Sequence, residues 1–166
     1  MSIIGIVASE RQTNQIKKLI NQENTKIELI SINPKSIENI KNIKFEIIVM
    51  QDTLEKLKEN QKYIAEILKK VKYLLLNADI EIKPEIFENI NAKILTYGLK
   101  QKSTITISSV EENQVIVSIQ RAFKSLDGKI IEQQEVPVEL IKNGTKELYN
   151  SLVKTVIINV CTVKNR

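Results

Sequence analysis

The most constraining feature of this sequence is a regular exchange between two hydrophobic periods over its first hundred residues. Short, nearly continuous apolar runs, typical of strands covered on both faces, alternate with segments whose apolar residues recur every three or four positions. The runs predict strands at residues 3–8, 26–32, 45–50, 72–77 and 93–97, and the periodic segments predict helices at 10–21, 34–43, 53–70 and 84–90. This alternation predicts an α/β fold with a layered, mostly parallel sheet.

After Gly98 the apolar and polar residues alternate one by one, as in strands with one exposed face. Turn-like residues at 111–113 and at Asp127-Gly128 separate these stretches, which predicts an antiparallel β-hairpin appendage. Pro137 suits an edge strand or a strand end. Residues 146–160 again follow a helical period. We expect one domain over residues 1–166, with an α/β core at 1–98, the hairpin region at 99–141 and the C-terminal helix at 142–166.

The amino-acid composition excludes several kinds of chemistry for this chain. The chain has no histidine, so it lacks the usual proton shuttle at neutral pH and the commonest metal ligand. Its single Cys161 can form neither an internal disulfide nor a Cys/His zinc site, and its apolar surroundings favour a small buried hydrophobe over a reactive thiol. We therefore predict no metal site and no catalytic cysteine.

The charge of the chain is modest and evenly spread. Lys and Arg number 25 against 20 Asp and Glu, a formal net charge of +5, with 14 basic and 13 acidic side chains in residues 1–90 and 11 and 7 in residues 91–166. Neither part is a basic patch, and 4% aromatic residues without Trp give few platforms for stacking bases, which argues against nucleic acid as a partner. No apolar run reaches the ~20 residues that span a bilayer. Without a basic, cleavable leader, we expect a cytoplasmic protein with no membrane partner.

The first strand-to-helix connection, residues 5–13, stands where α/β proteins bind phosphate. A working phosphate loop needs small residues that let the backbone wrap the phosphates, followed by Lys and Ser or Thr. Here Gly5 is the remaining glycine, Gln12 takes the place of the lysine, and Glu10 adds a negative charge. Thr13 still offers a hydroxyl for the metal side. The residues favour an ordinary strand-to-helix turn.

Several segments in sequence order resemble the central, ATP-binding domain of the Mur ligases, which join an amino acid or peptide to a nucleotide-linked peptidoglycan precursor. Gly5-Ile6 and Thr13 stand where that family opens and closes its glycine-rich loop. Residues 73–79, Tyr-Leu-Leu-Leu-Asn-Ala-Asp, are similar to the family's strand ending in Asn-x-Asp-Asp, with Ile80 in place of the last acid. Residues 92–99 are similar to its strand ending in Thr-Tyr-Gly. Gly144 and Asn150 match its last helix start, where Lys146-Glu147 replaces a His-Asn pair.

The resemblance covers nearly the whole chain and implies a P-loop or Rossmann-like architecture. It also implies that the family's nucleotide site corresponds to a few residues here, namely Thr13, Asn77, Asp79 and Asn150. The departures fall on the chemistry, because the phosphate lysine and all histidines are missing and Asp52 is what remains of the metal-binding acids. The family's acceptor-binding and amino-acid-binding domains are absent, so the proximity that makes ligation fast would be lost.

Two hypotheses of function follow. We expect a degenerate, non-catalytic relative of the Mur ligase central domain, a binding or regulatory module without a cofactor whose partner is an unknown protein or a second copy; the resemblance links it to cell-wall precursor metabolism. The alternative is a domain that holds ATP with Mg, or a nucleotide sugar, without hydrolysis. Thr13, Asn77, Asp79 and Asn150 would then bind the nucleotide, although Asn77 and Asp79 also fit a strand-end turn and Asn150 an exposed helix position.

Overall fold

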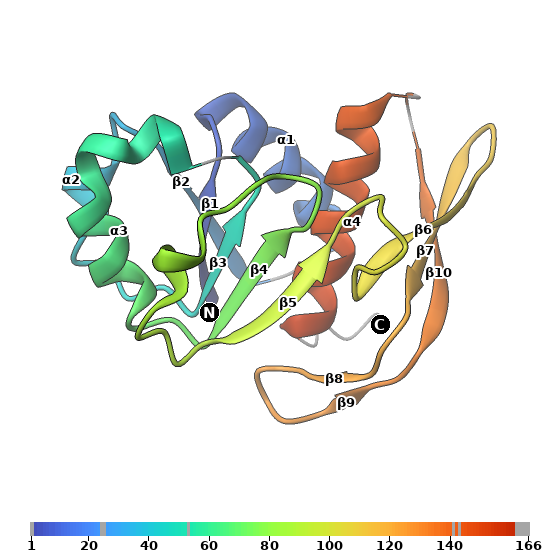
Figure 1. The fold of residues 1–166 in the computed structure, drawn as a ribbon. Helices are drawn as coiled ribbons and strands as arrows, with labels where there is room; N and C mark the ends of the chain where they lie inside the picture. Colours follow the sequence, from blue (N-terminus) through green and yellow to red (C-terminus); the bar gives the residue numbers. More distant parts are fainter. Residues whose placement is uncertain (1, 24–25, 53, 141, 143, 162–166) are drawn as a thin grey trace.

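The structure is a computed structural model that describes residues 2–23, 26–52, 54–140, 142 and 144–161 (Figure 1). Eight strands form one sheet in the order β10-β7-β6-β5-β4-β3-β1-β2. Their bounds are β1 (Ser2–Val7), β2 (Ile27–Ile32), β3 (Ile47–Met50), β4 (Tyr73–Asn77), β5 (Lys93–Tyr97), β6 (Ile105–Val110), β7 (Gln114–Ile119) and β10 (Gln134–Glu139).

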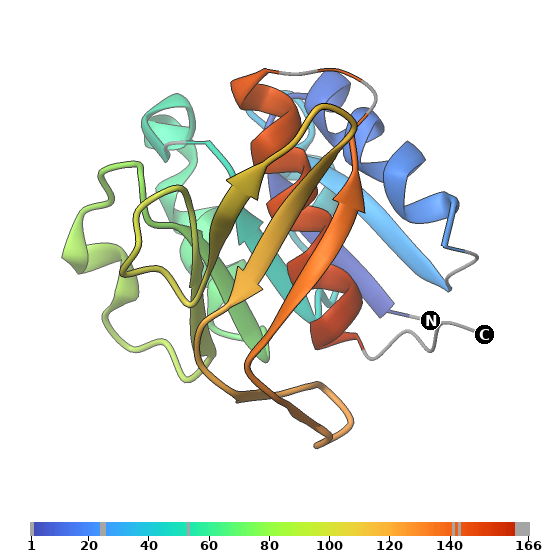
Figure 2. The same ribbon diagram turned by 90° about the vertical axis from the view of Figure 1, so that its right-hand side faces the viewer.

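All neighbouring pairs from β2 to β6 are parallel, whereas β6 with β7 and β7 with β10 are antiparallel. The predicted α/β fold with a mostly parallel sheet is therefore confirmed. The antiparallel strands continue this sheet, and a second, separate hairpin consists of β8 (Phe123–Lys124) and β9 (Ile130–Ile131). In Figure 2 this hairpin projects below the larger sheet.

The helices are α1 (Glu10–Asn21), α2 (Ile37–Ile40), α3 (Gln61–Leu68) and α4 (Thr145–Val160), with short 3-10 helices η1 (Leu54–Asn60) and η2 (Pro84–Phe87). Three predicted helices differ from this, and the one predicted at 34–43 is α-helical only over Ile37–Ile40. The one predicted at 53–70 is an α-helix only from Gln61, because the residues before it form η1, whose last residue, Asn60, has non-helical φ −114° and ψ 21°; Thr53 lies outside the described residues. The one predicted at 84–90 is a single 3-10 turn, since Glu88 is extended and Asn89 has φ 64°.

The two faces of the sheet carry separate apolar cores. One core contains α1 and α4, and the other contains α2, η1 and α3. Helix α4 is the more deeply embedded, with Leu152, Val153 and Ile157 fully buried. Burial of such a side chain contributes roughly 1.5–3 kcal/mol. Figure 2 shows β6, β7 and β10 in front of α4, so the sheet bends around this helix.

Helix α4 also holds the parallel and antiparallel parts of the sheet together. The ladder between β5 and β6 has one register pair, Tyr97 with Ile105. Two further bonds tie the junction, from the Gly98 amide to the Ile105 carbonyl (3.1 Å) and from the Thr104 amide to the Thr96 hydroxyl (3.0 Å). Because α4 contacts β5, β6 and β7, its apolar face supplies the continuity that the short ladder lacks. None of the helices in the described part of the chain is long and apolar enough to cross a bilayer.

An ion pair lies across the edge of the sheet at β2. Lys17 on α1 and Glu28 on β2 lie 3.2 Å apart. Glu28 is in register with Ile3, whose side chain packs into the core of α2 and α3, whereas α1 lies on the opposite face. The pair therefore crosses over the outer edge of β2. An exposed strand edge invites pairing with another chain, and charges placed across it oppose that pairing.

Gly5 lies in the middle of β1, not in the connection after it. A Cβ atom at this position would lie 2.5 Å from Ile32 Cδ1, 2.6 Å from Ile48 Cδ1 and 3.2 Å from Phe45 Cδ1. All three neighbours are at most 1% exposed, so none of them has space to move into. This glycine is needed for close packing of the core under β1.

Gly5→Ala should lower the free energy of unfolding by about 1–3 kcal/mol, because a methyl group is forced into a filled core. Ile32→Val, which removes the closest methyl group, should cost about 0.5–1.5 kcal/mol by itself. Urea unfolding of the two single variants and the double variant measures the coupling. The double variant should be more stable than the sum of the single effects predicts, and strict additivity would contradict the packing explanation.

Candidate functional site

The turn between β1 and α1 forms its own capping box. The Ser9 hydroxyl accepts a hydrogen bond from the Gln12 amide (3.2 Å), and the Gln12 side-chain oxygen accepts one from the Ser9 amide (3.3 Å). This reciprocal arrangement satisfies two donors that would otherwise be left over at a helix start. Gln12, which stands where a phosphate loop has its lysine, is therefore the third residue of α1 and the reciprocal partner of the N-cap Ser9.

Thr13 is buried beneath this turn. Its side chain is 2% exposed, and both its amide and its hydroxyl donate to the Ser9 carbonyl at 3.0 Å. Nearby, the Ser31 hydroxyl donates to the Ala8 carbonyl (2.7 Å) and the Asp52 amide donates to the Val7 carbonyl (2.9 Å). The bond between Asp52 and Val7 joins the carboxyl ends of β1 and β3. The strand order reverses at this point of the sheet, and open α/β sheets commonly bind ligands there.

A second polar group lies at the carboxyl ends of β4 and β5. The Asp79 carboxylate accepts hydrogen bonds from the amides of Leu99 (2.6 Å) and Lys100 (3.3 Å). It also accepts one from the hydroxyl of Tyr149 on α4 (2.7 Å). The Asn77 side-chain oxygen accepts from the Asp79 amide (3.0 Å) and shapes the turn. Asp79 thus joins the end of β4, the connection after β5 and α4.

Gly98 permits this approach. A Cβ atom there would lie 2.8 Å from Asp79 Oδ2 and 2.9 Å from Asp79 Cγ, so any larger residue would push the carboxylate away. The adjacent Tyr97 is fully buried, and its hydroxyl donates to the Met50 carbonyl (3.2 Å) and to the Gln51 side-chain oxygen. Burial raises the pKa of Tyr97 well above 10, with smaller contributions from Tyr149 and Asp79.

The structure brings some of the predicted site residues together and separates another. Asn77 and Asp79 share one turn, and α4 reaches Asp79 through Tyr149, the residue before the half-buried Asn150. Thr13 lies instead in the first turn of α1, bound to Ser9. Tyr149 was not among the predicted site residues, although it is the neighbour of Asn150, which was. Gln51 was not among them either, and the sequence contains no signal for it.

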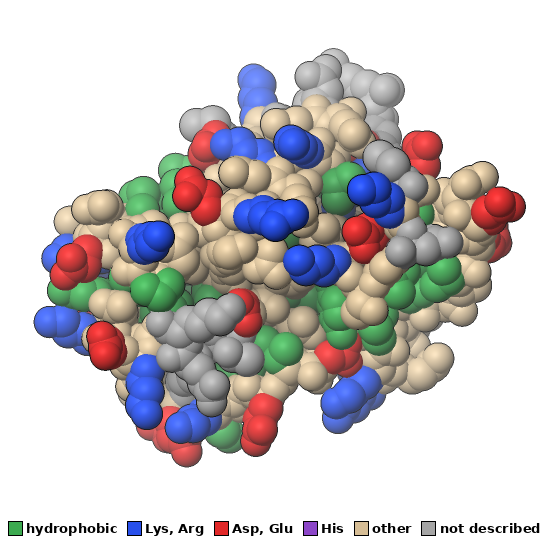
Figure 3. Space-filling view, turned by 90° about the horizontal axis from the view of Figure 1, so that it is seen from above, with side chains coloured by type: hydrophobic (Ala, Val, Ile, Leu, Met, Phe, Trp, Pro, Cys, Tyr) green, Lys and Arg blue, Asp and Glu red, His purple; other side chains and the backbone are tan. Residues whose placement is uncertain are grey.

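Charged side chains of both signs share the surface above the carboxyl ends of the parallel strands. The arrowheads of β3, β4 and β5 point toward the top of Figure 1, and the view from above shows Lys and Arg interspersed with Asp and Glu (Figure 3). Within the described ranges, no three His, Cys, Asp or Glu side chains are grouped closely enough to hold a metal ion.

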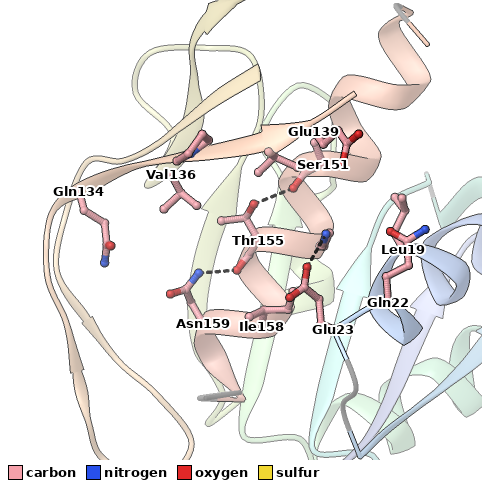
Figure 4. A pocket seen from close by; sticks show the side chains of 13 residues that line it. Leu19, Gln22, Glu23, Gln134, Val136, Glu139, Ser151, Thr155, Ile158 and Asn159 are labelled. Carbon is pink, nitrogen blue, oxygen red and sulfur yellow. Dashed lines mark hydrogen bonds and ion pairs between the residues drawn. The ribbon is translucent and has the colours of Figure 1, made fainter. Parts of the chain in front are cut away.

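A groove of about 390 Å³ lies between the end of α1, the face of α4 and the edge strand β10 (Figure 4). Leu19 and Ile158 from the helices and Val136 and Val138 from β10 give it apolar walls. The ion pair between Lys154 and Glu23, with a separation of 2.8 Å, lines it as well.

The polar face of α4 in this groove is already hydrogen-bonded within the helix. The side chains of Ser151, Thr155 and Asn159, spaced four residues apart, each donate to the carbonyl four residues earlier, at 2.8–2.9 Å. The hydroxyl groups of Ser151 and Thr155 and one N–H of Asn159 are therefore already hydrogen-bonded. The groove also offers a ligand the apolar side chains of both helices and β10, and the polar side chains of Gln22, Gln134 and Glu139.

The comparisons with known proteins leave the family of this chain open. No protein-family model matches it, and no curated protein matches it. Among solved structures, the apo form of D-lactate dehydrogenase from Escherichia coli is similar with a TM-score of 0.36 and 14% identity. The match covers 57% of this chain and 30% of the dehydrogenase chain. At this level of similarity we draw nothing from it about function.

The Tyr149–Asp79 contact should make stability depend on alkaline pH. Burial, the hydrogen bond to Asp79 and its negative charge raise the pKa of Tyr149 from 10.0 to about 12. The folded protein therefore keeps a proton that the unfolded chain loses, so this stabilisation is complete below pH 10 and is lost as the pH rises through about 12.

At pH 9, Tyr149→Phe should accordingly unfold at a lower urea concentration than the wild type. Its free energy of unfolding should be lower by roughly 1 kcal/mol, the contribution of one hydrogen bond. The difference should shrink as the pH approaches 12. Because both proteins share all other titrating groups, their difference isolates this hydroxyl. A difference that stays constant with pH would show that the hydroxyl has no such partner.

Cys161 caps the C-terminal end of α4, and its side chain, predicted to be buried, is partly buried against the core. Burial raises the pKa of its thiol to about 12, although a hydrogen bond with Ser2 acts in the opposite direction. The reactive thiolate is therefore scarce at neutral pH.

Iodoacetamide should accordingly modify Cys161 at least about tenfold more slowly in the native protein than in urea at pH 8. Mass spectrometry of timed samples measures both rates. Equal rates in the two states would contradict the partly buried, protonated thiol.

Proposed function

We propose that this chain is a non-catalytic binding or regulatory module related to the Mur ligase central domain. The observation that carries the proposal is the capping box of Ser9 and Gln12. Residues that would wrap a triphosphate in a working loop instead bind one another, and the Thr13 hydroxyl is turned toward the Ser9 carbonyl. A ligand in this turn would have to break these bonds before making its own.

The charges near the turn support the same proposal. Phosphoryl transfer relies on positioned cations and backbone amides that stabilise the charge spreading over the phosphate oxygens. Here Gln12 is neutral, and the exposed Glu10 places a carboxylate in the first turn of α1, where it occupies the favourable end of the helix dipole. The exposed Arg11 is the single cation of this turn.

The contacts of Asp79, at the carboxyl ends of β4 and β5, also support the proposal of a non-catalytic module. For Asp79 to hold a metal or a ribose, its carboxylate would have to exchange hydrogen bonds with Leu99, Lys100 and Tyr149 for the ligand. The adjacency of Asn77 and Asp79 favours one second candidate, a domain that holds ATP with Mg or a nucleotide sugar without hydrolysis. We rank it second because both side chains already shape the local fold.

Our proposal for the cellular role follows from the resemblance and the composition. The module would work in the cytoplasm alongside cell-wall precursor metabolism and would bind a protein partner or a second copy of itself. The groove between α1, α4 and β10 offers the surface for such a partner.

A thermal unfolding series with millimolar ATP and Mg tests the proposal. A nucleotide present at 100 times its dissociation constant raises the free energy of unfolding by ~2.7 kcal/mol. We expect no shift of the melting temperature with ATP and Mg, and no release of phosphate from ATP.

Two outcomes would replace the proposal. A magnesium-dependent rise in melting temperature that Asp79→Asn removes would favour the nucleotide-holding domain. Sustained phosphate release that Thr13→Ala abolishes would show an enzyme. Asn14→Ala, an exposed substitution one position further along α1, serves as the matched control.

A further inference from the structure

We propose that the edge strand β10 binds an extended segment of a partner protein in which apolar and basic residues alternate. The inference rests on the proposed function as a binding module and names the chemistry of the partner. Its evidence is the direction of the β10 backbone, the unlike character of its two faces and the charge around it.

The backbone of β10 presents hydrogen-bonding groups to solvent at alternate residues. On the inner side, the Leu140 amide donates to the Asn113 carbonyl across the end of β7. Alternation along an antiparallel ladder then directs residues 134, 136 and 138 toward β7 and residues 135, 137 and 139 outward. Pro137, which has no N–H, fits the outward position. Glu135 and Glu139 thus offer a donor and an acceptor each, and Pro137 offers an acceptor.

One face of β10 carries two valines, with Gln134 at its start, and opens into the groove of Figure 4. Val136 and Val138 are in register with Val117 and Val115, which are buried under α4. Both valines are only partly buried and line the groove beside Ile158. A strand added beyond β10 would direct every second side chain to this face, where apolar residues would be covered.

The other face of β10 is acidic. Glu135 and Glu139 are in register with Ser118 and Gln114, which lie on the side away from α4, and Glu139 also reaches the rim of the groove beside α4. A hollow of about 670 Å³ lies on the acidic face, and its lining includes Glu111, Glu112 and Glu139. Residues 130–140 contain three Glu and no Lys or Arg, although the whole chain has a net charge of +5. The side chains that an added strand directs to this face should therefore be Lys or Arg.

A second copy of this chain is a poorer occupant. Two β10 strands paired antiparallel about Pro137 would place Glu135 opposite Glu139 twice, and like charges directly opposite one another destabilise a strand pair. They would also bring together two positions that lack a donor. The edge at β2 is crossed by the pair of Lys17 and Glu28. A basic, alternating segment of another protein satisfies both faces and the charge.

Titration of the full chain with a nine-residue Val/Lys alternating peptide, followed by calorimetry and amide chemical shifts, tests the proposal. We expect saturable binding at low salt that shifts the amides of β10, and no binding of the corresponding Val/Glu peptide. The variant Glu135→Lys/Glu139→Lys should weaken binding by about tenfold. Glu38→Lys/Glu88→Lys makes the same change in net charge at exposed positions elsewhere and should bind as the wild type does.

Pro137→Val separates strand pairing from simple charge attraction. It adds one outward N–H, so it should tighten binding by about fivefold if the peptide pairs with β10. Failure of the Val/Lys peptide to bind, equal weakening in both double variants, or no effect of Pro137→Val would each overturn the proposal. None of these results bears on ATP, whose binding is measured separately, so failure here is distinguishable from failure of the proposed function.

Discussion

The carboxylate of Asp79 is the interaction on which the carboxyl edge of this sheet depends. It binds two amides of the connection after β5 and the hydroxyl of Tyr149, so one side chain fixes the positions of two loops and of α4. Helix α4 in turn packs against both the parallel and the antiparallel strands. The same acid that a resemblance to nucleotide-binding enzymes singles out therefore connects three parts of the fold.

The β1–α1 turn follows the same principle with different groups. Ser9 and Gln12 satisfy each other, and Thr13 is bound beneath them. A turn that satisfies its own hydrogen bonds is stabilising, because the polar groups at the start of the helix already have partners. The residues that give this turn its local stability are the same ones on which our proposal of a non-catalytic module rests.

The order of strands and helices could be predicted because the two hydrophobic periods are strong in this sequence. All five strands predicted in the first hundred residues lie within two residues of their predicted bounds, and α1 matches its prediction. The predicted helix lengths were wrong at particular residues. Asn60 and Asn89 interrupt segments whose apolar spacing alone predicts longer helices. The place of β6, β7 and β10 within the main sheet could not be read from alternation, which gives a strand its faces but not its neighbours.

The candidate sites also combine features that could be predicted from the sequence with features that could not. The adjacency of Asn77 and Asp79 followed from their spacing at a strand end, whereas the partners of Asp79 come from residues 20 and 70 positions away. The groove along β10 depends on three elements, and no local pattern marks it. Its two unlike faces emerge only when the register with β7 is known. Long-range pairing therefore decides what each polar group is available to do.

The central claim is that the polar groups at the carboxyl edge serve the fold and not a phosphate ligand. Titration of the protein with ATP and Mg, followed through the amide chemical shifts of Gln12, Thr13, Leu99 and Lys100, tests it most directly. We expect these four signals to stay in place up to millimolar nucleotide. Saturable shifts of the Gln12 and Thr13 amides would instead show that the turn opens to hold phosphate.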